Sequence, residues 1–63
     1  MINYKDVKNG AREEYKKRWG KPSLDDLIYL EGLTILFYDN RLEEESLSDI
    51  VDNIITEFEL EKN

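Results

Sequence analysis

The chain has 63 residues, of which 15 are acidic, 9 are basic and none is Cys or His, so its formal net charge is −6. These numbers exclude disulfides, thiolate or imidazole catalysis and the usual zinc sites. A chain this short forms one domain at most, so we expect a single domain over residues 1–63, and association with another subunit is the common source of extra stability that remains.

The first predicted element is a helix over about residues 4–19. Apolar and aromatic residues recur there at spacings of three and four, which places them on one helical face. They are Tyr4, Val7, Ala11, Tyr15 and Trp19. Gly20 predicts the end of the helix, and Pro22 follows it. Gly10 lies inside the segment and is expected to cost about 1 kcal/mol relative to Ala.

The second predicted element is a helix over about residues 24–39, which opens with Ser23 as a good N-cap. Its apolar side chains point all round the axis, which indicates a central helix packed on more than one side. The alternative is a strand over residues 33–38, because Thr, Ile, Phe and Tyr favour strands. Asn40 is expected to end the helix because Asn tolerates the left-handed conformation.

The third predicted element is a helix over about residues 46–60, where Ser46 and Asp49 resemble a capping box. An apolar stripe of almost ideal helical spacing runs through it. The stripe is Leu47, Ile50, Val51, Ile54, Ile55 and Phe58. The sequence therefore predicts an all-α fold, a small three-helix domain with short connections. Dimerisation through the second helix is an open option, since two short neighbours do not readily cover a helix that is apolar all round.

Charge is divided unevenly along the chain. Residues 1–21 carry seven bases and three acids, a sum of +4, whereas residues 22–63 carry two bases and twelve acids, a sum of −10. Four bases of the first helix fall within an arc of about 80°. They are Lys5, Lys8, Arg12 and Lys16. They could bind phosphate, or they could flank the core and pair with internal acids. Because the rest of the chain would repel a polyanion, nucleic-acid binding is not favoured.

Four acids of the third predicted helix form a matching stripe opposite its apolar face. They are Glu45, Asp49, Asp52 and Glu59. One interpretation is mimicry of a nucleic acid, which would let the protein occupy a basic surface. One helix alone supplies a charge every ~5 Å, however, against ~1.7 Å along duplex DNA. The alternative is a solvated face that keeps the protein in solution.

Glu31 lies among apolar residues of the second predicted helix, where a carboxylate that is buried without a partner is costly. Lys8 and Arg12 are its natural partners, because they flank the core face of the first helix. The alternative is that Glu31 contacts another protein from within an apolar, aromatic patch, with Tyr29, Phe37 or Tyr38 at its rim.

These patterns predict a small acidic binding protein without catalysis, metal or cofactor. The favoured hypothesis is an inhibitor or regulator that occupies a basic surface of a nucleic-acid-handling protein. The predicted contacts are the acidic stripe together with Tyr29, Glu31 and Phe37. A homodimeric structural or assembly protein is the first alternative, and a nucleic-acid binder through the first helix is the second. Size and acidity are typical of small regulators from phages or mobile elements, and also of structural accessories.

The location of the protein is also inferred from what the sequence lacks. The first ten residues contain no apolar run, which argues against a secretory signal, and no stretch approaches the ~18 apolar residues of a membrane span. We therefore expect a cytoplasmic protein with no membrane contact.

Overall fold

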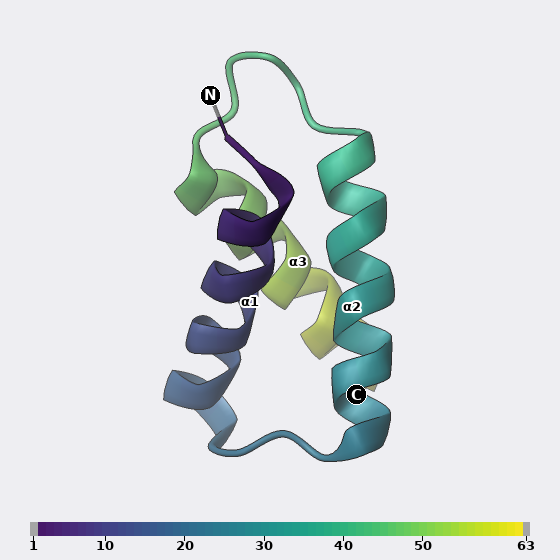
Figure 1. The fold of residues 1–63 in the computed structure, drawn as a ribbon. Helices are drawn as coiled ribbons and strands as arrows, with labels where there is room; N and C mark the ends of the chain where they lie inside the picture. The colour runs from purple at the N-terminus through teal and green to yellow at the C-terminus, as the bar shows by residue number, and fades with distance from the viewer. Residues whose placement is uncertain (1, 63) are drawn as a thin grey trace.

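A computed structural model describes residues 2–62 as three helices, each packed against the other two (Figure 1). They are α1 (Tyr4–Trp19), α2 (Leu24–Asp39) and α3 (Leu47–Lys62). The predicted all-α fold is confirmed, and the described part of the chain contains no strand. The strand alternative for residues 33–38 is therefore wrong, since they form the last turns of α2.

Side-chain caps set the start of each helix. The Asn3 side chain accepts a hydrogen bond from the Asp6 N–H at 2.9 Å, and Ser23 Oγ accepts one from the Asp26 N–H at 3.2 Å. Ser46 Oγ accepts one from the Asp49 N–H at 3.1 Å, so Ser46 is the N-cap of α3. Each bond satisfies one of the amide groups that have no partner in the first turn. Asn3 is a cap that the pattern of apolar residues did not reveal.

The first two helices end in different ways. Gly20 has a positive φ of 83°, and its N–H donates to the Lys16 carbonyl at 3.0 Å. Asn40 has φ −103°, so its expected left-handed conformation is wrong. Its backbone N–H donates to the Leu36 carbonyl at 3.1 Å, and its side-chain Nδ2 donates to the same carbonyl at 2.8 Å.

The core lies along the line where the three helices meet. Its buried side chains are Val7, Ala11 and Tyr15 from α1, Leu30, Leu33 and Thr34 from α2, and Ile50, Val51, Ile54, Ile55 and Phe58 from α3. The predicted stripe of α3 is buried except at Leu47, which is exposed. Thr34 satisfies its hydroxyl locally by donating to the Leu30 carbonyl at 2.7 Å.

Gly10 explains how closely α1 approaches α3. A Cβ placed on Gly10 would lie 2.8 Å from Val51 Cγ2, which is closer than carbon atoms tolerate. The conformational cost of a glycine within a helix is therefore offset by packing that a side chain would prevent.

Candidate functional site

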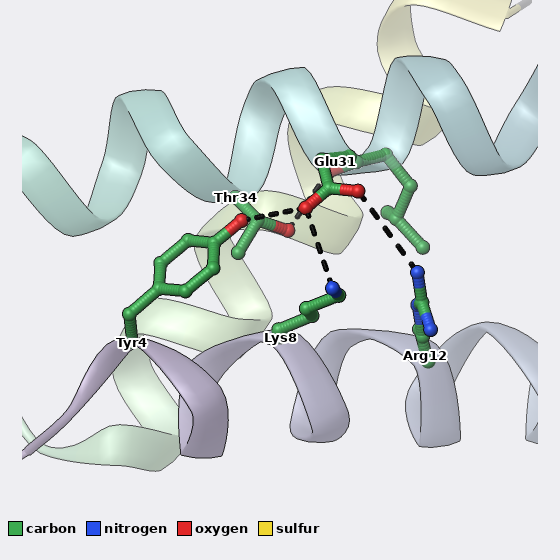
Figure 2. Close-up of polar contacts among 6 residues, drawn as sticks. Tyr4, Lys8, Arg12, Glu31 and Thr34 are labelled. Carbon is green, nitrogen blue, oxygen red and sulfur yellow. Dashed lines mark hydrogen bonds and ion pairs between the residues drawn. The ribbon is translucent and has the colours of Figure 1, made fainter.

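Glu31 is the centre of a polar cluster that joins α1 to α2 (Figure 2). The Tyr4 hydroxyl donates to Glu31 Oε2 at 2.8 Å, and Lys8 Nζ lies 3.5 Å from the same oxygen. Arg12 Nη2 lies 4.0 Å from Glu31 Oε1. The internal pairing expected for Lys8 and Arg12 is therefore present, with Tyr4 as a further donor. Tyr4 was missed because its helical position identified it only as a core residue.

The cluster shifts the titration of its members in opposite directions. The hydrogen bond from Tyr4, followed by the charge of Lys8, lowers the pKa of Glu31 because both favour the carboxylate. Burial, together with the hydrogen bond to Glu31, raises the pKa of Tyr4. The Glu31 side chain is still 39% exposed, so solvent screens these interactions. The cluster holds the two helices in register while leaving one edge of Glu31 accessible.

A second polar cluster joins all three helices at the first turn of α2. The Tyr15 hydroxyl donates to Asp26 Oδ2 at 2.7 Å, and Lys62 Nζ lies 3.2 Å from Asp26 Oδ1. The hydrogen bond from Tyr15, then that from Lys62, lowers the pKa of Asp26. Trp19 lies beside this cluster and packs on Tyr15 and Phe58, with ring centroids 5.0 and 5.5 Å apart.

The most exposed apolar area is the outer face of α2. We call it the α2 surface and define it by Leu24, Ile28, Ile35 and Leu36, which are 73%, 64%, 46% and 53% exposed. Gly32 lies among them on the helical wheel, and a Cβ placed there would meet no atom within 4 Å. The α2 surface is therefore an apolar stripe that is interrupted near its middle by a residue without a side chain.

The α2 surface has a basic edge and an acidic edge. On the side of α1, an open groove contains Arg12, Lys16, Lys21, Pro22 and Leu27. Arg12 lies beside Glu31 of the same chain, so we keep the name basic rim for Lys16 and Lys21. On the side of α3, the carboxylates of Glu57 and Glu61 lie near Tyr29, and we call them the acidic rim. Burial, followed by the charge of Glu61, raises the pKa of Tyr29. Leu27 and Tyr29 both belong to the N-terminal half of α2, so the two rims flank the same half of this helix.

The apolar contacts predicted from the sequence differ from those that the structure exposes. Tyr29 and Phe37 are half-buried and pack against the core, and the Tyr29 ring lies 5.6 Å from that of Phe58. The four residues of the α2 surface were missed because an apolar pattern on every side does not reveal which side faces the core. Gly32 was a usable signal, since a glycine inside a helix requires an explanation.

The four acids of the predicted stripe have different surroundings. Glu45 lies in the loop before α3, so its predicted place on the helix is wrong. Its Oε1 accepts from the Leu42 N–H at 2.7 Å and its Oε2 from Asn53 Nδ2 at 3.3 Å. Glu59 Oε1 lies 3.8 Å from Arg18 Nη1. Asp49 and Asp52 are exposed, and neither side chain makes an ion pair or hydrogen bond within residues 2–62. The accessible part of the stripe is thus centred on these two aspartates.

The four bases that the sequence placed in one arc of the first helix also differ in their surroundings. Lys8 and Arg12 lie next to Glu31, whereas Lys5 and Lys16 are exposed and form no ion pair with residues of the described range. Two of the four cations are therefore occupied by an acid of the same chain, which weakens the case for a phosphate-binding strip.

Two further findings concern metal binding and membrane crossing. Among residues 2–62, no three carboxylates lie in an arrangement that could hold a metal ion. None of the helices described combines the length and apolar character needed to cross a membrane.

Comparison of the chain with protein-family models, with curated proteins and with solved structures finds no match.

Proposed function

We propose that this protein works by binding another protein chain through the α2 surface and performs no chemistry. The observation that carries the proposal is the exposure of Leu24, Ile28, Ile35 and Leu36 on one helix. Single exposed apolar residues are ordinary, but a contiguous group on a small domain usually marks an interface. Exposure of this stripe to water has a cost that contact with another chain would remove.

The free energy gained by covering the α2 surface can be estimated from the exposed fractions of its four side chains. Complete burial of one large aliphatic side chain contributes about 1.5–3 kcal/mol. Because the four residues are roughly half to three-quarters exposed, covering them would contribute about 4–7 kcal/mol. Association costs about 4 kcal/mol or more in lost freedom of motion. One apolar stripe therefore only offsets that cost, and a stable complex requires a partner that brings an apolar surface of its own.

The proposal excludes catalysis because of the groups that the chain offers. With neither His nor Cys, the candidates for proton transfer are mainly carboxylates, lysines and tyrosines. The hydroxyls of Tyr4 and Tyr15 donate to carboxylates, and both have a raised pKa, which opposes their use as bases. The grooves described on the surface are open to solvent and would leave a substrate exposed to water.

Site-specific photo-crosslinking tests the proposal. A photoreactive amino acid replaces Ile28 on the α2 surface or, as a matched control, Thr56 on the exposed face of α3. After irradiation in the source cells, we expect a covalent protein adduct with the residue-28 probe and little with the residue-56 probe. Equal yields at both positions, or no adduct at residue 28, would contradict the proposal.

A second candidate function is electrostatic binding of a basic protein, including inhibition of a nucleic-acid-handling protein. Its support is the exposure of Asp49 and Asp52 without a partner among the described residues, in a chain of net charge −6. Charges of this kind mainly increase the rate and the selectivity of association. This function uses a different face from the α2 surface, so the two are compatible.

A lysine-rich peptide serves as the probe for this second function. We expect Asp49→Asn combined with Asp52→Asn to weaken binding and to reduce its dependence on salt. The control is Asp6→Asn combined with Glu13→Gln, which removes the same charge from exposed positions of α1. Equal weakening by both pairs would mean that net charge alone attracts the peptide, and this outcome would contradict a site at Asp49 and Asp52.

A further inference from the structure

We propose that the chain which covers the α2 surface is a second copy of this protein, with two α2 helices packed in parallel and crossing at Gly32. This inference rests on the proposed function and names its partner. In a two-fold symmetric dimer, the same surface of each copy meets itself. The α2 surface fits this role because it is apolar along its length and has charges of opposite sign on its two edges.

Gly32 provides the first argument. Its place in α2 lowers the helix propensity, and a Cβ there would meet nothing within 4 Å of the same subunit, so packing inside the subunit does not explain it. Gly10 differs, because Val51 occupies the space that its side chain would need. A glycine on an exposed apolar stripe lets the backbone of another helix approach closely. Gly32 lies between Ile28 and Ile35, where two such helices would cross.

The two rims provide the second argument, and they select the orientation. The basic rim lies on the α1 side of α2 and the acidic rim on the α3 side, at the same half of the helix. A two-fold axis parallel to α2 leaves each rim at the same level along the helix but turns the second copy so that its α3 side lies opposite the α1 side of the first. Each basic rim therefore faces the acidic rim of the other copy. An antiparallel arrangement would set each rim beside the C-terminal half of the other α2, away from both rims of that copy. Complementary charges therefore favour the parallel dimer.

Two acids at the ends of the stripe do not distinguish these orientations. Asp25 and Asp39 are exposed and lie within the arc of the α2 surface on the helical wheel, one near each end of the helix. In the parallel dimer each lies near its own counterpart, and in the antiparallel dimer each lies near the other, so like charges meet in both cases.

Available area provides the third argument. The molecule measures 31 × 18 × 16 Å, so a specific interface of about 1,000 Å² in total would use most of one broad face of each copy, that is, the α2 surface together with its two rims. A chain of 63 residues without disulfides also belongs to the size class in which oligomerisation commonly completes the core.

Light scattering after size exclusion, over a range of concentrations, tests the dimer. We expect the wild type to approach twice its chain mass of 7.5 kDa as concentration rises. Ile28→Glu should raise the dissociation constant at least tenfold, and Thr56→Glu, an equal change at an exposed position of α3, should not. A wild type that remains monomeric at millimolar concentration would overturn the inference.

Gly32→Ala tests the crossing point without disturbing the subunit. We expect it to raise the melting temperature of the monomeric Ile28→Glu protein, because alanine favours the helix. In the otherwise wild-type chain it should weaken the dimer about tenfold, because the added methyl group separates the two backbones. A Gly32→Ala dimer that is as tight as the wild-type dimer, or tighter, would overturn the crossing at this position.

Disulfide trapping tests the orientation, and the chain contains no native cysteine to interfere. A disulfide requires Cα atoms within about 7 Å. In the parallel dimer Ile28→Cys chains should crosslink with one another, as should Ile35→Cys chains. Crosslinks that form only between Ile28→Cys and Leu36→Cys chains would show an antiparallel dimer and overturn the proposed arrangement.

The outcomes also separate this inference from the proposed function. If a monomeric protein gives a residue-28 photo-adduct with a different protein, the second copy is ruled out as the partner and the binding function remains. If residue 28 gives no adduct and the protein is monomeric, both are wrong.

Discussion

The Tyr4 hydroxyl donates a 2.8 Å hydrogen bond to Glu31, which lies 27 residues further along the chain and on a different helix. The same Tyr4 ring lies edge-on to Tyr38, with centroids 5.5 Å apart. One side chain at the start of α1 therefore contacts both the middle and the end of α2. The register of these two helices depends on polar geometry as well as on the apolar core.

Tyr4→Phe isolates the polar part of this contact. The ring and its packing on Tyr38 remain, but Glu31 loses a donor that stabilises its ionised form. We expect the melting temperature at neutral pH to fall by a few degrees and the pKa of Glu31 to rise toward its ordinary value. NMR titration of the Glu31 side chain checks the second effect. An unchanged pKa would mean that Lys8 and Arg12 alone hold the carboxylate ionised.

Acid should destabilise the fold through Glu31 and Asp26. The pKa of each carboxyl group is lower in the folded state than its ordinary value, which is 4.5 for Glu31 and 3.8 for Asp26. Their stabilising contribution is therefore complete above those values and is lost as pH falls through the lower folded values. We expect the melting temperature to decline below about pH 4.5. Glu31→Gln combined with Asp26→Asn should decline less steeply, and an identical slope would contradict this assignment.

The two helical glycines should respond oppositely to alanine. Gly10→Ala places a methyl group against Val51, and overpacking of this kind costs about 1–3 kcal/mol. Gly32→Ala meets open space and should stabilise the monomeric Ile28→Glu protein by up to about 1 kcal/mol. Urea unfolding followed by the fluorescence of Trp19, the single tryptophan, measures both. Stabilisation by Gly10→Ala would contradict the close approach of α1 to α3.

Ser46→Ala should weaken the start of α3. Ser46 Oγ accepts the Asp49 N–H at 3.1 Å, and loss of an N-cap of this kind costs about 0.5–2 kcal/mol. Unfolding in urea gives the change in stability, and Ser48→Ala, at an exposed position within the same helix, is the control. Equal effects of the two substitutions would mean that Ser46 does not act as a cap.

The local sequence determined the three helices and most of their limits. Ser23, Ser46 and Gly20 act on neighbouring backbone groups, so their effect can be inferred without knowledge of the fold. The stripe of α3 was equally clear, because α3 is apolar on one side only, and every residue of the stripe except Leu47 faces the core. Asn40 ended α2 as expected, but without the left-handed conformation, since both its backbone N–H and its side chain donate to the Leu36 carbonyl.

Only the tertiary structure decided which side of α2 is buried. A helix that is apolar all round has no preferred direction in its own sequence, so the positions of α1 and α3 selected Leu30, Leu33 and Thr34 for the core. The same packing left Leu24 and Ile28 in solvent. It also determined that Gly10 has a neighbour whereas Gly32 has none. These distinctions depend on contacts between residues far apart in the chain, and a periodic pattern within one helix contains no information about them.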